Sequence, residues 1–240
     1  MYKGGVNMIW GYGLFYDSTM VLAFIGLALS LLASARVKSA FSKYSKVRIY
    51  SGMTGAQAAQ RVLETAGICE VRIERVQGSL TDHYDPVNKI LRLSDNVYNT
   101  ASIAAVGVAA HECGHAIQDN KGYLPLKIRG TIVPAVNISS SLSWPIFVAG
   151  LLFSSSALMT AGIILFSLAV IFQIITLPVE FNASSRALNT LKGTGILSGE
   201  ESKGAAVVLR AAGLTYVASL AATALQLLRL IILRGGRNRD

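Results

Sequence analysis

The residues best suited to chemistry lie in the segment 109–116, which reads Ala-Ala-His-Glu-Cys-Gly-His-Ala. His111 and His115 are four residues apart, so on a helix their side chains lie one turn apart on the same face. Two imidazoles at this spacing can bind one Zn²⁺, which lowers the pKa of a bound water to about 7. Glu112 is placed to take the proton as that water attacks a carbonyl group. The spacing therefore predicts a zinc helix with Glu112 as general base.

The flanking residues predict that this segment is helical. Residues 101–110 are mostly small and apolar without proline, and polar residues return at Gln118 and Asp119. The alternative is an ordinary helix whose histidines satisfy buried hydrogen bonds. The chain has only three histidines in 240 residues. A chance match to His-Glu-x-x-His is rare in such a composition, which favours the zinc interpretation.

The composition predicts an integral membrane protein. Hydrophobic residues make up 52% of the chain, charged residues only 15%, and the mean hydropathy is +0.48. Residues 130–179 contain no Lys, Arg, Asp or Glu, and one helical crossing takes about 20 residues. The net charge is +9, with the basic residues clustered beside apolar segments. This pattern indicates membrane orientation and contact with anionic lipid, and we expect no nucleic-acid partner.

Charge placement divides the chain into five parts. Residues 18–35 are uncharged and basic residues follow directly, which predicts a retained first transmembrane helix with its basic end in the cytoplasm. The alternative, a cleaved signal peptide, would have its basic residues on the other side of the apolar core. We expect an N-terminal segment with the first transmembrane helix (1–35), a cytoplasmic α+β region ending in the zinc helix (36–129), a transmembrane hairpin (130–179), a helix carrying a third ligand (180–210), and a fourth membrane helix with a basic tail (211–240).

The polar region predicts a small α+β unit. Thr54 is a candidate N-cap for a helix over 56–65, and residues 70–76 and 89–93 alternate as short strands. Residues 82–86 are rich in turn formers. A strand edge beside the zinc helix would hold an extended peptide by main-chain hydrogen bonds. Cys69 and Cys113 give no disulfide framework.

The membrane segments leave one question open. Residues 131–154 and 158–178 predict the hairpin arms, with residues 154–156 as the outer turn. Residues 211–228 predict a fourth membrane helix. If that helix crosses, the arginines after it lie outside, against the usual charge rule, so an interfacial helix is the alternative.

Catalytic zinc usually has three protein ligands, and Glu180 is the leading candidate for the third. It is the first charge after the hairpin, and on a helix it shares a face with Ala183 and Ser184. A carboxylate at membrane depth is costly unless it is functional or bonded. The alternative is a boundary glutamate paired with Arg186. His83 is a less favoured ligand.

Three segments together resemble a known family. Residues 109–119, preceded by 80–86 and followed by 180–184, are similar to the neutral zinc metallopeptidases of the YugP type. The resemblance covers about residues 10 to 230, and the family name supplies no substrate. It implies a membrane zinc peptidase: a mainly α protein with about four transmembrane helices and a small, gluzincin-like α+β zinc-peptidase unit.

A more distant likeness is to the HtpX and CaaX-processing membrane peptidases. They place two membrane helices between His-Glu-x-x-His and a later Glu-x-x-Ala-Asp whose glutamate binds zinc. This likeness implies that His111, His115 and Glu180 are the ligands and Glu112 the base. Ser184 stands where that pattern has aspartate, so Asp119 or another group would orient a ligand histidine.

The sequence thus predicts a zinc metalloendopeptidase in a bacterial-type cytoplasmic membrane, with its active site facing the cytoplasm. Its substrates would be cytoplasmic or membrane-proximal polypeptides. His83, Tyr84 or Arg186 would supply a hydrogen-bond donor to the oxyanion. Two other classes of protein stay open: a non-catalytic, zinc-stabilised membrane scaffold or partner-binding protein, and a small transporter whose histidines line a polar path.

Overall fold

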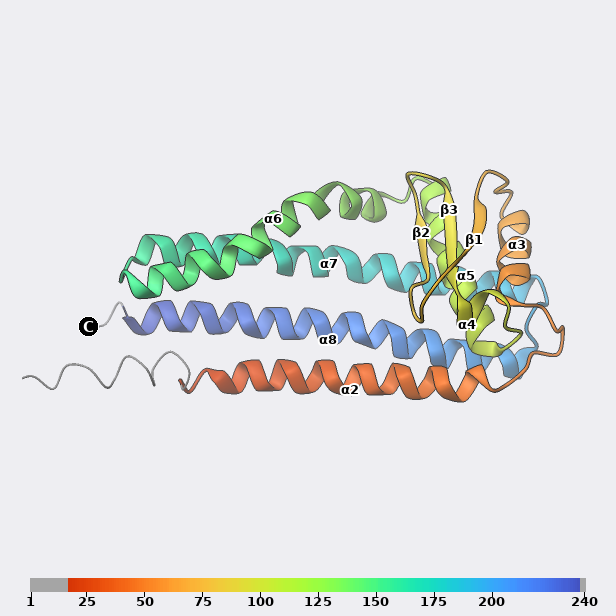
Figure 1. Cartoon of the computed structure of the whole chain (residues 1–240), viewed down its shortest axis with the longest axis horizontal. Helices are drawn as coiled ribbons and strands as arrows, with labels where there is room; N and C mark the ends of the chain where they lie inside the picture. Colours follow the sequence, from red (N-terminus) through yellow and green to blue (C-terminus); the bar gives the residue numbers. More distant parts are fainter. Residues whose placement is uncertain (1–16, 238–240) are drawn as a thin grey trace, which may run out of the picture. The chain divides into compact units, whose positions relative to one another are not determined.

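The computed structural model describes residues 17–237 of the chain, so the first sixteen residues of the predicted N-terminal segment and the end of the basic tail lie outside the described residues. The described part is mainly helical, with one small sheet (Figure 1). Its elements are α2 (Met20–Ser45), α3 (Gly55–Thr65), β1 (Arg72–Val76), β2 (His83–Asp85), β3 (Ile90–Ser94), α4 (Asp95–Tyr98), α5 (Ile103–Asn120), α6 (Leu124–Leu152), α7 (Ser156–Gly193) and α8 (Gly199–Arg237).

Within residues 17–237, four helices are long and apolar enough to cross a membrane, namely α2, α6, α7 and α8. The predicted hairpin appears as α6 and α7, joined by a turn at residues 153–155. Helix α2 continues ten residues beyond the predicted end at Ala35 and includes the basic residues that follow it. The mainly helical fold with about four candidate membrane helices and a few short strands is confirmed.

The chain divides into two compact units, and we call the larger one the zinc-helix unit. It comprises residues 32–134 and 171–217, and contains the sheet and helices α3, α4 and α5. Helix α3 begins as predicted: the Thr54 hydroxyl accepts a hydrogen bond from the Gln57 backbone N–H, and the Gln57 side chain accepts one from the Thr54 N–H. Such a capping box satisfies backbone donors that a helix start otherwise leaves unpaired.

The sheet has the order β1-β3-β2, with β1 parallel and β2 antiparallel to the central β3. Strands β1 and β3 match the two predicted strands closely. Strand β2 lies where the sequence predicted a turn, and the turn itself occupies residues 86–89. The Asp85 carboxylate accepts backbone hydrogen bonds from Val87 and Asn88 there, so the turn-forming residues marked the end of a strand. Figure 1 shows the sheet beside α3 and α5.

The core of the zinc-helix unit is built around α5. Small apolar side chains of this helix are fully buried, together with Leu91 and Leu93 of β3 and Val62 and Leu63 of α3. The side chain of Ser102 caps α5 by accepting a hydrogen bond from the Ala105 N–H. Side chains alternate between the two faces of a strand, so Leu91 and Leu93 point to the same face of β3. Both belong to the buried cluster that contains α5, so the sheet covers this helix.

The second unit, which we call the apolar unit, has residues 17–31, 135–170 and 218–237 as its described part. It contains the turn between α6 and α7. Phe147, Met159 and Leu230 form its small buried cluster. A Cβ at Gly150 would lie 2.6 Å from the Met159 backbone nitrogen, so glycine allows α6 and α7 to pack closely.

Candidate metal centre

Helix α5 carries the two histidines and Glu112, and it packs against α7 at very short range. The Cα of Gly114 faces the Ala183 carbonyl, and a Cβ at Gly114 would overlap that oxygen. Glycine inside a helix is otherwise unfavourable by about 1 kcal/mol relative to alanine. The glycine of the motif is therefore explained by the close contact, which brings α7 and its Glu180 beside the histidines.

His111, His115 and Glu180 come together, and their candidate ligand atoms all lie within 4.8 Å of one another. The Glu180 Oε2 atom is 3.3 Å from His111 Nε2 and 3.6 Å from His115 Nε2. The two imidazole rings lie edge to face with centroids 4.9 Å apart. Glu180 is only 3% exposed, so its carboxylate depends on these neighbours and on Arg129 for partners.

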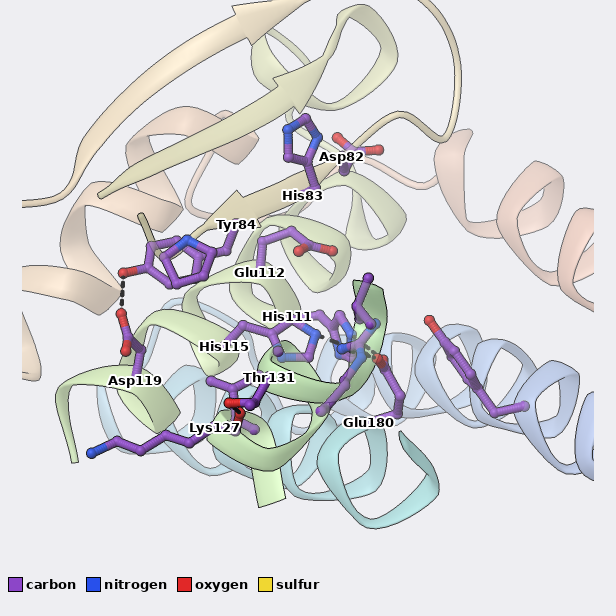
Figure 2. Close-up of a pocket in the computed structure, with 16 residues that line it drawn as sticks. Asp82, His83, Tyr84, His111, Glu112, His115, Asp119, Lys127, Thr131 and Glu180 are labelled. Atoms are coloured by element: carbon purple, nitrogen blue, oxygen red, sulfur yellow. Dashed lines mark hydrogen bonds and ion pairs between the residues drawn. The ribbon is translucent and has the colours of Figure 1, made fainter. Parts of the chain in front are cut away.

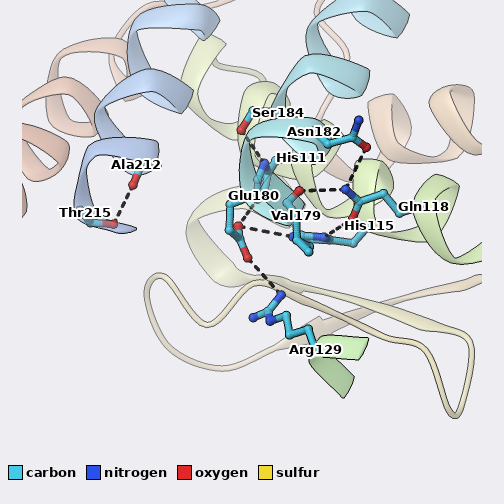
Figure 3. Close-up of polar contacts among 10 residues, drawn as sticks. All are labelled: His111, His115, Gln118, Arg129, Val179, Glu180, Asn182, Ser184, Ala212 and Thr215. Carbon is cyan, nitrogen blue, oxygen red and sulfur yellow. Dashed lines mark hydrogen bonds and ion pairs between the residues drawn. The ribbon is translucent and has the colours of Figure 1, made fainter. Parts of the chain in front are cut away.

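Gln118 fixes the orientation of the His115 ring (Figure 3). Its side-chain nitrogen donates to the Val179 carbonyl at 2.8 Å and to the Asn182 side-chain oxygen at 3.0 Å. Its oxygen is therefore left to face His115 Nδ1 at 3.0 Å, which makes that nitrogen the donor. The lone pair of His115 is then on Nε2, the atom directed at Glu180.

His111 has a simpler partner. Its Nδ1 lies 3.1 Å from the Ser184 hydroxyl. Arg129, near the start of α6, donates from Nη1 to the Glu180 Oε1 atom at 3.1 Å, which leaves Oε2 toward the histidines. Each candidate ligand thus has a side-chain contact on the atom that does not face the centre, an arrangement common around bound metals.

The side chains of this centre suit a divalent metal ion. The lone pair of His115 Nε2 faces the lone pairs of a buried carboxylate, which is unfavourable unless a cation or a proton lies between them. Two imidazole nitrogens and one carboxylate oxygen are ligands that Zn²⁺ prefers, and a catalytic zinc site has three protein ligands with one open position. The residues present fit such an ion.

Glu112 lies in the same pocket, which has a volume of about 800 Å³. Figure 2 shows its side chain between the segment that carries Asp82 and His83 and the two histidines of α5. Glu112 is 9% exposed, so the carboxylate reaches the pocket from a mostly buried position. A pocket of this size can enclose a peptide side chain and the bond beside it.

The other residues considered from the sequence lie elsewhere around the pocket. His83 is exposed on β2, with Nδ1 2.8 Å from the Thr81 carbonyl. Asp119 accepts hydrogen bonds from the Tyr84 hydroxyl at 2.8 Å and from Lys89 Nζ at 2.6 Å, so it contacts the sheet rather than a histidine. Arg186 donates to the side-chain oxygen of Asn182 at 2.7 Å and lies over the Tyr123 ring.

Three residues of the centre were missed by the sequence analysis. Gln118 follows His115 by three residues on the same helical face, so spacing alone could have identified it. Arg129 and Tyr216 both line the pocket. No local signal indicates either one, because Arg129 lies on the next helix and Tyr216 lies within the predicted fourth membrane helix.

Charges and burial shift the pKa of several groups outside the candidate membrane helices. Burial alone would lower the pKa of His115, but the hydrogen bond to Glu180 and the nearby Glu112 carboxylate raise it. Burial raises the pKa of the Cys113 thiol well above its usual value, and Glu112 adds to this. Cys113 therefore stays a protonated, buried thiol. Burial and the hydrogen bond to Asp119 raise the pKa of Tyr84 as well.

Comparison with known proteins assigns the chain to a family. Residues 19–235 match the model of the family described as "Putative neutral zinc metallopeptidase". The chain is 48% identical over 220 residues to the "Putative membrane protease YugP" of Bacillus subtilis (strain 168), covering 91% of this chain and 98% of that protein. No solved structure matches. The chain belongs to this zinc metallopeptidase family, as the sequence motifs predicted.

Proposed function

We propose that the chain is a membrane-embedded zinc endopeptidase with a gluzincin-like site, in which His111, His115 and Glu180 hold the metal and Glu112 is the general base. One observation is the main support for this proposal. Two imidazole nitrogens and a buried carboxylate converge within 4.8 Å, and a second carboxylate lines the same pocket. The family description and the name of the similar B. subtilis protein point to the same class of reaction.

The metal, when bound, would supply Lewis acidity, which makes water more acidic and a peptide carbonyl more electrophilic. The residues of the chain supply the rest. Glu112 would take the proton of the attacking water and pass it to the leaving nitrogen, so one carboxylate acts first as base and then as acid. Arg129 would hold the orientation of the Glu180 carboxylate through the 3.1 Å contact with its Oε1 atom.

We assign the oxyanion donor to Tyr216 in preference to the residues considered from the sequence. The Tyr84 hydroxyl already donates to Asp119, and Arg186 donates to Asn182. His83 Nδ1 faces the Thr81 carbonyl. Tyr216 lines the pocket together with Glu112, and its hydroxyl is hydrogen-bonded to Glu180, so this donor lies at the candidate centre itself rather than at the sheet or beside Asn182.

Strand β2 suggests how a substrate is held. It is at the edge of the sheet in the described part of the chain, and His83, Tyr84 and Pro86 line the pocket. An extended polypeptide added beside β2 would gain main-chain hydrogen bonds irrespective of its sequence. We therefore propose an unfolded or extended polypeptide substrate, cytoplasmic or membrane-proximal.

Membrane insertion is supported by exposed apolar side chains on the four candidate membrane helices. On α2, for example, Phe24, Leu31 and Leu32 are more than 60% exposed, which is costly in water and favourable in lipid. Basic residues follow the apolar part of α2 directly. The charge rule then puts the zinc-helix unit on the cytoplasmic side.

The two cysteines allow a direct test of this orientation. Cys69 is exposed on the zinc-helix unit, whereas Cys113 is fully buried. In intact cells a membrane-impermeant maleimide should leave the protein unlabelled, and permeabilised cells should label Cys69. Cys69→Ser is the control that should abolish labelling in both. Labelling of Cys69 in intact cells would reverse the proposed orientation.

The activity is tested with Glu112→Gln in purified, zinc-loaded protein. We expect wild type to cleave unfolded and membrane-protein substrates, and Glu112→Gln to lose at least about 1,000-fold of that activity because the general base is gone. Zinc content, measured by metal analysis, should stay near one per chain in both. Glu70→Gln, at an exposed glutamate, is the matched control and should cleave like wild type.

The same experiment separates the enzyme from a zinc-stabilised scaffold. A scaffold would retain zinc in wild type and Glu112→Gln but cleave nothing in either form. Glu180→Gln adds a test of the ligand set: the site should bind zinc much more weakly because a charged ligand is lost. Unchanged zinc affinity in Glu180→Gln would remove Glu180 from the proposed centre.

A further inference from the structure

A second, smaller pocket of about 150 Å³ adjoins the metal centre inside the zinc-helix unit. It shares four lining residues with the larger pocket: Asp82, His111, Glu112 and Tyr216. Glu112 and His111 therefore form a common wall between the two spaces. A substrate group in the small pocket would therefore lie next to the part of the substrate that faces Glu112 in the larger pocket.

The remainder of the small pocket is apolar. Phe41 of α2, Val108 of α5, and Val208, Leu209 and Ala212 of α8 contribute to its lining. A cavity of about 150 Å³ lined by apolar side chains accommodates a group the size of benzene. Leucine and phenylalanine side chains are of this size, whereas an indole ring is larger.

Leu80 adds an independent observation at this pocket. It lines the small pocket, yet the residue is 54% exposed. Its backbone has φ of 59°, a left-handed conformation that non-glycine residues rarely adopt. Non-glycine residues in strained backbone conformations cluster at active sites and ligand-binding segments, and Leu80 places one at the pocket that Glu112 lines.

We propose that the small pocket is the specificity pocket of the peptidase, and that it takes one medium-sized apolar side chain next to the scissile bond. This inference rests on the proposed function of Glu112 and deepens it. The pocket should favour Leu, Ile, Met and Phe, accept Gly and Ala weakly, and exclude Trp. Burial of an apolar side chain there would also hold the adjacent carbonyl in front of Glu112.

Lysine is the main rival occupant, because Asp82 and Glu112 carry negative charge at the shared wall. The Asp82 carboxylate, however, already accepts hydrogen bonds from the Ser94 backbone N–H at 2.7 Å and from the Ser94 hydroxyl at 3.0 Å. Transfer of an ammonium group among Phe41, Val108 and Leu209 would cost its hydration. The other carboxylate of the wall, Glu112, is the proposed general base, and an ion pair there would block it. The structure therefore favours an apolar side chain over a basic one.

The first test measures binding, so that it does not depend on cleavage. Fluorescein-labelled peptides with a Gly/Ser host and a single central guest residue (Gly, Ala, Leu, Phe, Trp or Lys) are titrated onto full-length, zinc-loaded Glu112→Gln protein. Leu and Phe peptides should bind at least about tenfold tighter than Gly, Lys and Trp peptides. Equal affinity for all guests, or tightest binding of Lys, would overturn the inference.

The second test changes the pocket in two directions. Ala212→Leu should fill it and reduce the preference for Leu over Ala by about tenfold, and Val108→Ala should enlarge it and shift the preference toward Phe and Trp. Ala224→Leu, at an exposed position of the same helix, is the control and should keep the wild-type order. Zinc content of each variant verifies that the site is intact, and the same guest order in all variants would refute the pocket.

Cleavage by wild type separates the two proposals. Glu112-dependent cleavage without any preference for an apolar neighbour would leave the peptidase standing and remove the specificity pocket. Selective binding of Leu and Phe peptides without Glu112-dependent cleavage would do the reverse, because the pocket would then serve a binding protein. Preferred cleavage next to the guest Leu or Phe would support both.

Discussion

The two compact units of the chain hold their helices together by different kinds of contact. In the zinc-helix unit, α5 and α7 are joined by a network of directed hydrogen bonds that runs from His115 through Gln118 to Asn182. In the apolar unit, α6 and α7 are joined by apolar packing around Phe147. Directed contacts fix side-chain orientation, whereas apolar packing mainly fixes distance. A metal centre needs the first kind, and a membrane hairpin can depend on the second.

One feature is shared by both units, namely a glycine where two helices approach closely. Gly114 does this at the Ala183 carbonyl, and Gly150 at the Met159 backbone nitrogen. The two glycines therefore have the same steric role, but only Gly114 lies between the elements that carry the ligands. Substituting each glycine in turn therefore distinguishes an effect on helix packing, expected at both positions, from an effect on zinc binding, expected at Gly114 alone.

The largest effect is expected for Gly114→Ala. The new Cβ would force α5 and α7 apart, which should lower the free energy of unfolding by about 3 kcal/mol and weaken zinc binding by far more than tenfold. Gly150→Ala should cost similar stability but leave zinc stoichiometry unchanged. Thermal unfolding in detergent and metal analysis of the purified variants measure both.

Gly107→Ala is the matched control on the zinc helix, since a Cβ there would make only an ordinary contact, 3.5 Å from the Ala205 Cβ. It should be neutral or slightly stabilising, because alanine is the better helix former. Full zinc binding in Gly114→Ala would show that the close approach of α7 is not needed to assemble the centre.

The next prediction concerns directed contacts in the apolar unit, where Arg229 also donates to the Thr19 hydroxyl at 3.3 Å. Arg229 donates to the Asp17 carboxylate at 3.1 Å, and its side chain is only 10% exposed. Arg229→Met should lower the free energy of unfolding by about 3 kcal/mol, because it leaves a largely buried carboxylate without its charged partner. Zinc affinity should be unchanged. The double variant Asp17→Asn, Arg229→Met should recover most of the loss.

The same pair should respond to acid. Burial alone would raise the pKa of Asp17, but hydrogen bonds from Thr19 and Arg229 lower it below the ordinary value of 3.8. The stabilising contribution is therefore complete above that value and is lost as the pH falls through the lower, folded-state pKa. The difference in stability between wild type and Arg229→Met should shrink over that acid range, because protonation removes the uncompensated charge of Asp17. A difference that is constant with pH would contradict the assignment.

A third prediction returns to the directed network of the zinc-helix unit. Gln118→Leu keeps the volume but removes the acceptor for His115 Nδ1, so the ring loses its fixed tautomer. Zinc affinity should fall about 10- to 100-fold, measured by competition with a chromogenic chelator. Gln118→Glu should recover part of the affinity because it restores the acceptor. Gln60→Leu, on the exposed face of α3, is the control and should not change affinity.

The sequence predicted the parts of this molecule that have a local signal. The zinc-motif helix, the helix capped by Thr54 and the hairpin turn all followed from spacing and charge within a short segment. Strand β2 did not, because its pairing with β3 outweighs the turn-forming residues around it. The approach of Tyr216 to the pocket also could not be predicted, since it depends on how distant helices pack. Whether the motif residues catalyse peptide hydrolysis stays a prediction.

The smallest effect is expected at Ser184, the counterpart of Gln118 on the other histidine. The Ser184 hydroxyl is the side-chain partner of His111 Nδ1, but His111 is 14% exposed, so water can take its place in Ser184→Ala. Zinc affinity should therefore fall less than about tenfold, clearly less than in Gln118→Leu. Ser184→Asp should increase zinc affinity, because a carboxylate at that nitrogen makes the ring a better ligand. A larger loss in Ser184→Ala than in Gln118→Leu would mean that His111, not His115, is the histidine whose orientation limits metal binding.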